Sequence, residues 1–121
     1  MAYEIPGLLN TLLAAADLRS SQYRAVVVNS SGRAALAGAA ARDVGILQNS
    51  PNTGEAGTVM WDGVSKVVAA AAITAGALVA TNASGQVITA TTGQASCGVA
   101  RTAAGGANEI ISVQLMSSVA P

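Results

Sequence analysis

Val79 to Val99 reads V-A-T-N-A-S-G-Q-V-I-T-A-T-T-G-Q-A-S-C-G-V, and a similar stretch occurs earlier in the chain. That earlier stretch, Val28 to Ile46, reads V-N-S-S-G-R-A-A-L-A-G-A-A-A-R-D-V-G-I. The matching positions stand a constant 53 residues apart: Asn29 and Asn82, Ser31 and Ser84, Gly32 and Gly85, Ala37 and Ala90, Gly45 and Gly98. Because no insertion is needed to align them, we predict an internal duplication whose halves are related by an approximate two-fold axis.

Each copy predicts a hairpin followed by a further strand. Val26 to Val28 is β-branched and suits a pleated surface, and Asn29 to Gly32 has the composition of a turn. The first copy then predicts strands at 33–37 and 43–48, and the second copy predicts strands at 78–81, 86–90 and 97–101. Several short strands separated by turn signals favour a small all-β barrel or sandwich built from two pseudo-repeats.

The first 22 residues stand outside the duplication in this alignment. Leu8, Leu9, Leu12 and Leu13 recur at helical spacing, but so short a segment forms either an isolated helix or an extended apolar arm. The leucines cover either the chain's own barrel or a neighbour. Docking on a neighbour predicts that a chain lacking residues 1–16 stays folded and loses binding. We divide the chain into an arm and linker at 1–22, a β domain at 23–116 with pseudo-repeats at about 23–69 and 76–116, and a tail at 117–121.

The segments between the repeats predict two loops and one bulged strand. The loop at 49–57 is rich in Pro, Gly, Asn and Ser, and its counterpart is 102–108, so we expect both at one end of the barrel as a contact rim. Thr58 to Ala69 favours a single strand with a bulge near Gly63. Ala69 to Ala77 is compatible with one short helical turn, and Ile111, Val113 and Leu115 alternate with polar residues in a closing strand.

The composition points to a protein that works by contact. Of its 121 residues, 51% are hydrophobic but only 2% are aromatic, so the core must be built from small aliphatic side chains. We therefore expect contacts outside the monomer to contribute to stability. Six basic and six acidic residues give zero net charge, which argues against nucleic-acid binding and against an electrostatic membrane anchor. The start has no basic segment of a signal peptide, and the apolar stretch 67–80 is too short to span a bilayer.

The residues that chemistry requires are missing or scattered. The chain has no His and one cysteine, Cys97, which excludes a structural zinc site and an intrachain disulfide. Cys97 aligns with Val44 and is predicted to be a buried apolar residue. The six carboxylates form neither a pair along the sequence nor a calcium loop, which leaves pairing in space open, and no glycine-rich phosphate loop occurs. We predict no enzyme activity, no cofactor and no metal.

A family resemblance rests on these motifs taken in order. They are Y-R-A-V-V-V, N-S-S-G, V-G-I-L-Q-N-S-P, V-S-K-V-V-A-A-A-A-I-T-A-G-A, N-A-S-G, C-G-V-A-R-T-A and E-I-I-S-V-Q-L. The segment A-x-x-A-G-A-x-V at 72–79 and the V-G-I and C-G-V strands are the most diagnostic. The chain resembles, over about residues 17–116, the small capsid decoration (cement) proteins of tailed bacteriophages, particularly those infecting actinobacteria.

The resemblance implies a β-barrel-like homotrimer, made in the host cytoplasm, that binds the capsid exterior and clamps neighbouring major capsid proteins. The alternative is a surface-displayed module, such as a head fibre, that attaches to host surfaces or glycans. For contact with the capsid or with another protomer we single out apolar arm residues, two loop residues and the only Trp. These are Tyr3, Ile5, Leu8, Leu9, Leu12, Leu13, Pro51, Asn52 and Trp61.

Overall fold

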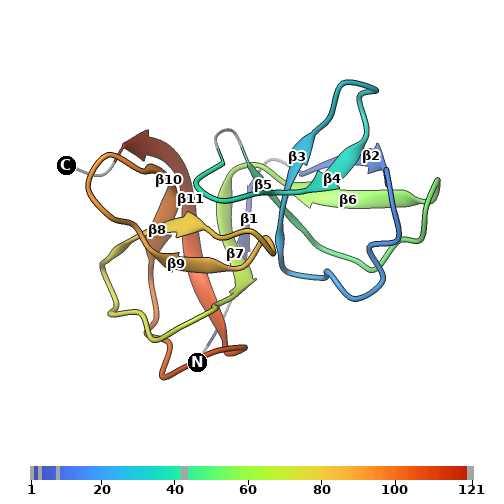
Figure 1. The fold of residues 1–121 in the computed structure, drawn as a ribbon. Helices are drawn as coiled ribbons and strands as arrows, with labels where there is room; N and C mark the ends of the chain where they lie inside the picture. Colours follow the sequence, from blue (N-terminus) through green and yellow to red (C-terminus); the bar gives the residue numbers. More distant parts are fainter. Residues whose placement is uncertain (1, 3, 8, 42–43, 120–121) are drawn as a thin grey trace.

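Two antiparallel sheets make up the computed structural model, which describes residues 2, 4–7, 9–41 and 44–119 (Figure 1). The six-stranded sheet has the order β1-β7-β11-β10-β8-β9 and the five-stranded sheet the order β2-β6-β5-β3-β4. The first six strands are β1 (Ile5–Pro6), β2 (Leu9–Leu13), β3 (Ala25–Val28), β4 (Ala34–Leu36), β5 (Gly45–Leu47) and β6 (Ala56–Met60). The other five are β7 (Gly63–Val68), β8 (Leu78–Thr81), β9 (Val87–Thr89), β10 (Ala95–Ala100) and β11 (Ile110–Val119).

The predicted all-β class is confirmed, in its sandwich-like form. Neither sheet closes into a barrel, because the outermost strands β1 and β9, and likewise β2 and β4, do not pair with each other. Three of these edges are short, since β1 has two residues and β4 and β9 have three each, whereas β2 has five. The sheets lie side by side as two lobes, and β1 and β7 are the strands of the six-stranded sheet nearest the other lobe (Figure 1).

The predicted helical turn at 69–77 is wrong. Over this stretch Ala69 bridges Val87 in parallel and Ile73 bridges Ala104 in the antiparallel sense. The only local feature is a turn in which the Ala77 amide donates to the Thr74 carbonyl at 3.1 Å, with Gly76 at φ +89°. Long-range backbone partners have displaced the local hydrogen bonds that a helix needs, and the described residues contain no helix.

The backbone pattern of the first copy recurs in the second at the predicted offset of 53 residues. Ala25 and Val26 pair with Ile46 and Gly45, and Leu78 and Val79 pair with Val99 and Gly98. Both hairpin turns are held by an asparagine. The Asn29 Oδ1 accepts from the amides of residues 31 and 33 at 3.0 and 2.9 Å, and the Asn82 Oδ1 accepts from 84 and 86 at 2.9 and 3.0 Å. Gly32 and Gly85 follow with φ of +74° and +73°.

The structural equivalence reaches further than the sequence match. In one sheet β2 pairs with β6, and at the corresponding place in the other β7 pairs with β11. Ala14 after β2 bridges Ala34, and Ala69 after β7 bridges Val87, which is the equivalent of Ala34. We call β2–β6 the first unit and β7–β11 the second unit. The leucine-rich segment 9–13 is therefore the first strand of a unit.

Thr58 to Ala69 is two strands, and the predicted single bulged strand is wrong. β6 ends at Met60 in the five-stranded sheet and β7 begins at Gly63 in the six-stranded sheet. The chain redirects at Asp62 and Gly63, where the Asp62 Oδ1 accepts from the Gly63 amide at 2.8 Å and Gly63 has φ +102°. This junction separates the two units.

The units meet head to tail, so the predicted two-fold relation is wrong. The Ala25 amide of the first unit donates to the Gly85 carbonyl of the second at 2.7 Å. Gly32 is the equivalent of Gly85, and Leu78 is the equivalent of Ala25. A two-fold axis would therefore also place the Gly32 turn against Leu78. Instead, no described heavy atom lies within 4 Å of a Cβ built on Gly32, whereas one built on Gly85 would touch Leu36 and the Ala25 carbonyl.

The core has two parts. The larger cluster joins second-unit residues such as Val67, Val79 and Val113 to Ile46 and Met60 of the first unit. The smaller cluster lies on the other face of the five-stranded sheet and contains Ala14, Leu18, Val26, Ala34, Leu47 and Val59. Because Ala14 is fully buried there, directly after β2, residues 9–14 are part of the folded unit. The truncation at residue 16 is therefore expected to unfold it.

The loops at 49–57 and 102–108 do not share one end of the molecule. The β5–β6 connection lies at the right-hand side of one lobe and the β10–β11 connection at the bottom of the other (Figure 1). The expected rim fails because it assumed that the two units lie parallel about a common axis.

Candidate protein interface

Large apolar side chains that remain in contact with water are the main surface feature of the described residues. They are Ile5 (53% exposed), Val28 (51%), Leu13, Ile110 and Met116 (46% each) and Leu9 (44%). Single exposed apolar residues are ordinary, but groups of them mark sites where another protein docks. Their grouping by strand therefore decides which surfaces are candidates.

The first group lies on β2, the outer strand of the five-stranded sheet. Leu9 pairs with Met60 and Leu13 with Ala56, and both leucines point to the same side because residues two apart in a strand do so. Leu12 points the other way and packs on the smaller core cluster. Of the predicted arm residues, Leu9 and Leu13 are available to a partner and Leu12 is largely internal.

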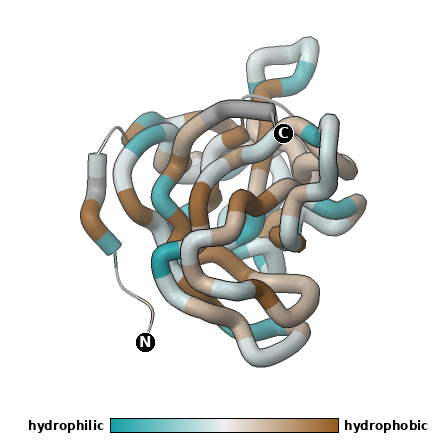
Figure 2. The backbone as a smooth tube through the Cα atoms, turned by 90° about the vertical axis from the view of Figure 1, so that its left-hand side faces the viewer, coloured by the Kyte–Doolittle hydropathy of each residue, from teal (hydrophilic) through white to brown (hydrophobic). Residues whose placement is uncertain are grey.

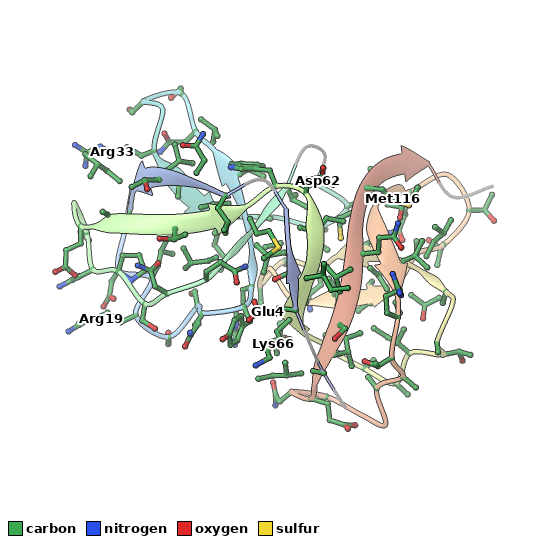
Figure 3. The ribbon with its side chains drawn as sticks, turned by 180° about the vertical axis from the view of Figure 1, so that it is seen from behind. Glu4, Arg19, Arg33, Asp62, Lys66 and Met116 are labelled. Atoms are coloured by element: carbon green, nitrogen blue, oxygen red, sulfur yellow. The ribbon has the colours of Figure 1, made fainter. Side chains whose placement is uncertain are left out.

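The second group lies on the outer face of the six-stranded sheet. Ile111, Val113 and Leu115 face the core, so the alternation places Ile110, Gln114 and Met116 outward. Ile5 joins this face through the row in which Ile5 pairs with Val64 and Val64 with Gln114. Figure 2 shows the segment that follows the N-terminus running along one side of the molecule, and Figure 3 shows Met116 near the end of β11, with Glu4 beside β1.

Three other predicted contact residues are less accessible. Pro51 is buried, and its carbonyl accepts from the Leu18 amide at 3.0 Å. Asn52 is half-buried in a turn, where its amide donates to the Glu55 Oε1 at 2.7 Å. Trp61 is half-buried, and its ring lies over Gly45, 2.9 Å from where a Cβ would stand. Tyr3 and Leu8 lie outside the described residues.

Sequence reasoning did not single out Val28, Ile110 or Met116. The signal for Ile110 and Met116 was present, because the alternation that buries Ile111 and Leu115 places Ile110 and Met116 on the opposite face of the strand. Val28 carried no such signal, since the strand Val26 to Val28 is uniformly apolar.

Polar chemistry on the described surface is sparse. One ion pair is found among the described residues, where the Arg19 Nη2 lies 2.9 Å from the Asp17 Oδ2. The hydrogen bond from the Arg19 side chain lowers the pKa of Asp17 to about 2. Lys66 lies over the Tyr23 ring at 5.9 Å from its centroid, and both side chains are half-buried. No three His, Cys, Asp or Glu side chains of the described part come together as a metal site would require.

Cys97 is buried, as predicted from its alignment with Val44. Burial raises the pKa of its thiol to about 11, so the sulfur is neutral at pH 7 and is a poor nucleophile. A membrane-crossing helix is likewise not found in the described part of the chain.

The fold and its surface define a small two-sheet protein that offers apolar contact area. A family of phage cement proteins matches residues 11–115, and the chain belongs to that family. It is thus a capsid-associated structural protein of a phage, in agreement with the resemblance noted in the sequence.

A solved structure of similar fold is the N base of the head fibre gp8.5 of bacteriophage phi29. It superposes with a TM-score of 0.73 over 94% of this chain and 98% of the fibre chain, at 15% identity. At that identity the likeness concerns the fold alone. No curated protein matches the sequence.

Proposed function

We propose that this protein binds the outer surface of the capsid and reinforces the contacts between neighbouring major capsid proteins. The observation that carries the proposal is the apolar side of β2, where Leu9 and Leu13 are nearly half exposed in a chain of zero net charge. Burying a large aliphatic side chain stabilises an interface by about 1.5–3 kcal/mol. Such a surface gains energy from contact alone and needs no cofactor.

The proposal includes self-association as a homotrimer. Several weak contacts per oligomer act together on a shell that presents many copies of the same site, so avidity exceeds the affinity of each contact. The proposal also holds that the protein is made in the host cytoplasm and has no enzyme activity. Its scattered carboxylates and buried thiol support that last point.

The test mixes purified protein with undecorated expanded capsids of its phage and measures the bound fraction by sedimentation. Leu9→Asp and Leu13→Asp should each weaken binding at least tenfold, because each places a charge in an apolar contact. Asn10→Asp is the matched control. It adds the same charge to the opposite side of β2 and keeps the Oδ1 that accepts from the Thr11 amide at 2.8 Å. Wild-type binding that equals a no-capsid blank would end the proposal.

Reinforcement is a separate measurement. Decorated and bare capsids are heated, and DNA release is followed with an intercalating dye. Decorated shells should release DNA at a higher temperature, since ligands that bind only the intact state shift its apparent stability. Equal release temperatures at full occupancy would leave a capsid-binding protein without a clamping role.

The head-fibre base of similar fold supports a second candidate, a module that attaches the particle to host surfaces or glycans. Against it, the two aromatic side chains that the structure describes, Tyr23 and Trp61, are both half-buried. A glycan array and a host-cell pull-down test it directly, and binding in either at micromolar protein would favour it.

A further inference from the structure

The joint between the two units contains contacts that are made in one direction only: the equivalent contact, with the two units exchanged, is not formed among the described residues. In the first of these, the turn 82–85 of the second unit lies on β3 and β4 of the first. The Ala25 amide donates to the Gly85 carbonyl at 2.7 Å, and Nη1 of Arg24 donates to the Ser84 carbonyl at 3.2 Å. Leu36 lies against Gly85, at 2.7 Å from where its Cβ would stand. A turn of one unit thus fits a strand pair of the other.

In the second contact, the loop after β4 of the first unit covers the end of β8. The Thr81 hydroxyl donates to the Gly38 carbonyl at 2.6 Å and accepts from the Ala41 amide at 3.0 Å. The Ala40 amide donates to the Thr81 carbonyl at 2.8 Å. These bonds leave Thr81 only 1% exposed.

Several equivalents of these groups, in the turn of the first unit and the loop of the second, lie uncovered. Val28 is the equivalent of Thr81 and is 51% exposed. The loop 91–94 is the equivalent of 38–41, and within the described part nothing comes within 4 Å of a Cβ on its Gly93. Gly32, the equivalent of Gly85, is equally open.

One row of side chains across each sheet also differs in exposure between the two units. In the first unit Met60, Ile46 and Ala25 form a row that is 2%, 0% and 0% exposed, covered by the second unit. The equivalent row in the second unit is Gln114, Val99 and Leu78. Gln114 is exposed, and Val99 and Leu78 are half-buried. The first unit thus has an unused turn, and the second unit has an unused surface of the kind that receives a turn.

We propose that a second copy of this chain fills that surface: Val28 and the turn 29–32 of one copy dock on Leu78 and the loop 91–94 of the next. This inference rests on the self-association included in the proposed function, and it names the surfaces that meet. The geometry repeats the joint within the chain, so its fit has a precedent in the same molecule. Contacts of this head-to-tail kind close into a ring when the rotation between copies allows it.

The joint between copies is weaker than the joint within the chain. Ala77 stands where Arg24 stands in the first unit, so the guanidinium bond to the turn is lost. Thr89 replaces Leu36 opposite the turn glycine. Val28 adds apolar contact where Thr81 has a hydroxyl. We therefore expect association that reverses on dilution.

The first experiment measures self-association of the full chain by sedimentation velocity over a range of concentrations. Val28→Asp should raise the dissociation constant at least tenfold, and Val28→Thr, which reproduces the residue of the inner joint, should preserve association. Ala103→Asp, on the exposed β10–β11 loop outside the joint, is the control and should behave as wild type.

The second experiment tests direction by cross-linking. Val28→Cys and Thr92→Cys are prepared as separate proteins and treated with a short bismaleimide, alone and mixed. Head-to-tail docking predicts a cross-linked dimer in the mixture and little in either protein alone. Wild type should give none, because Cys97 is buried. A mixture of Val28→Cys with Ala103→Cys should also give none.

The outcomes separate this inference from the proposed function. An oligomer that Val28→Asp leaves intact, with no cross-link in the mixture, overturns the inference and keeps self-association. A wild-type protein that stays monomeric at all concentrations overturns both the inference and the self-association included in the proposed function. If Val28→Asp abolishes capsid binding without changing the oligomer, the surface belongs to the capsid contact and the inference fails.

Discussion

The two units of this protein share one backbone pattern and differ in what covers it. Both have the same strand order, the same register and the same asparagine-held turn with glycine at φ near +74°. Yet the row around Ile46 is fully buried, while the row around Val99 is partly open to water. Backbone hydrogen bonds therefore decide how the strands pair. The side chains that point out of each face of the sheet decide what packs on that face.

Between the two units, side-chain polarity matches exposure at one pair of equivalent positions and does not match it at another. Met60 is buried and its equivalent, Gln114, is exposed, which is the ordinary relation between polarity and exposure. Val28 and Thr81 show the reverse, because the apolar residue is the exposed one. The second pair is the informative one, since an exposed valine at the site of a buried threonine points to a partner.

The largest expected effect compares Ile46→Ala with Val99→Ala. Ile46→Ala should lower the free energy of unfolding by about 2–5 kcal/mol, because it leaves a cavity in the joint between the units. Val99→Ala should cost less than about 1 kcal/mol in the monomer, since its side chain is only half-buried. Urea denaturation at low protein concentration measures both, and equal losses would show that the two rows are covered alike.

The next comparison uses two buried glycines, Gly98 and Gly45. A Cβ on Gly98 would press on the carbonyl of Gln114, whereas one on Gly45 would press on the Val59 and Trp61 side chains. Side chains shift more readily than a paired strand. Gly98→Ala should therefore lower the free energy of unfolding by about 3 kcal/mol or more and Gly45→Ala by about 1–3 kcal/mol. Thermal unfolding ranks the two, and the reverse order would show that Trp61 is held rigidly.

Replacing the turn asparagines gives a smaller difference. Each Oδ1 accepts from two backbone amides, so Asn29→Ala and Asn82→Ala should each cost about 1–2 kcal/mol. Asn82→Ala should cost more in dilute solution, because its turn also docks on β3. The two losses should become similar as protein concentration rises if the Asn29 turn docks on another copy. Unfolding curves at two concentrations check this.

The smallest effect is a pH dependence confined to the first unit. The folded pKa of Asp17 is lowered to about 2 by Arg19, so its stabilising contribution is present above the unfolded pKa near 3.8 and is lost as pH falls towards 2. The pair is exposed, so the loss is small. Asp17→Asn should flatten the stability curve slightly between pH 4 and 2, while Ala72→Ser, at the equivalent place in the second unit, should not. An equally large flattening with Ala72→Ser would show that the Asp17–Arg19 pair does not cause the pH dependence.

The repeat was predictable from sequence because its signals are local. Asn29 and Asn82 specify the turns by accepting from nearby backbone amides, with a glycine three residues later, and the β-branched residues before and after each turn favour the strands. The alternation in 111–115 likewise reported which side faces the core. Most of the strand assignments outside the arm rest on such short-range signals.

The prediction failed where distant segments compete with local preference. The alanines of 69–77 favour a helix in isolation, but Val87 and Ala104 supply bridging partners 18 and 31 residues away. The leucine spacing of the arm was compatible with a helix, yet pairing with β6 drew it into a sheet. The break at Gly63 was read as a bulge because sequence does not show that the two flanking strands join different sheets.

The sequence by itself determined the turns, most of the strands outside the arm and the two-copy pattern, because each follows from residues close together in the chain. The tertiary structure alone decided that the units meet head to tail, that β2 completes the first unit, and that Val28 and Leu78 remain available for contact. Those features depend on which surfaces pack together. Packing is decided by shape and burial between residues far apart in sequence, which no local pattern reports.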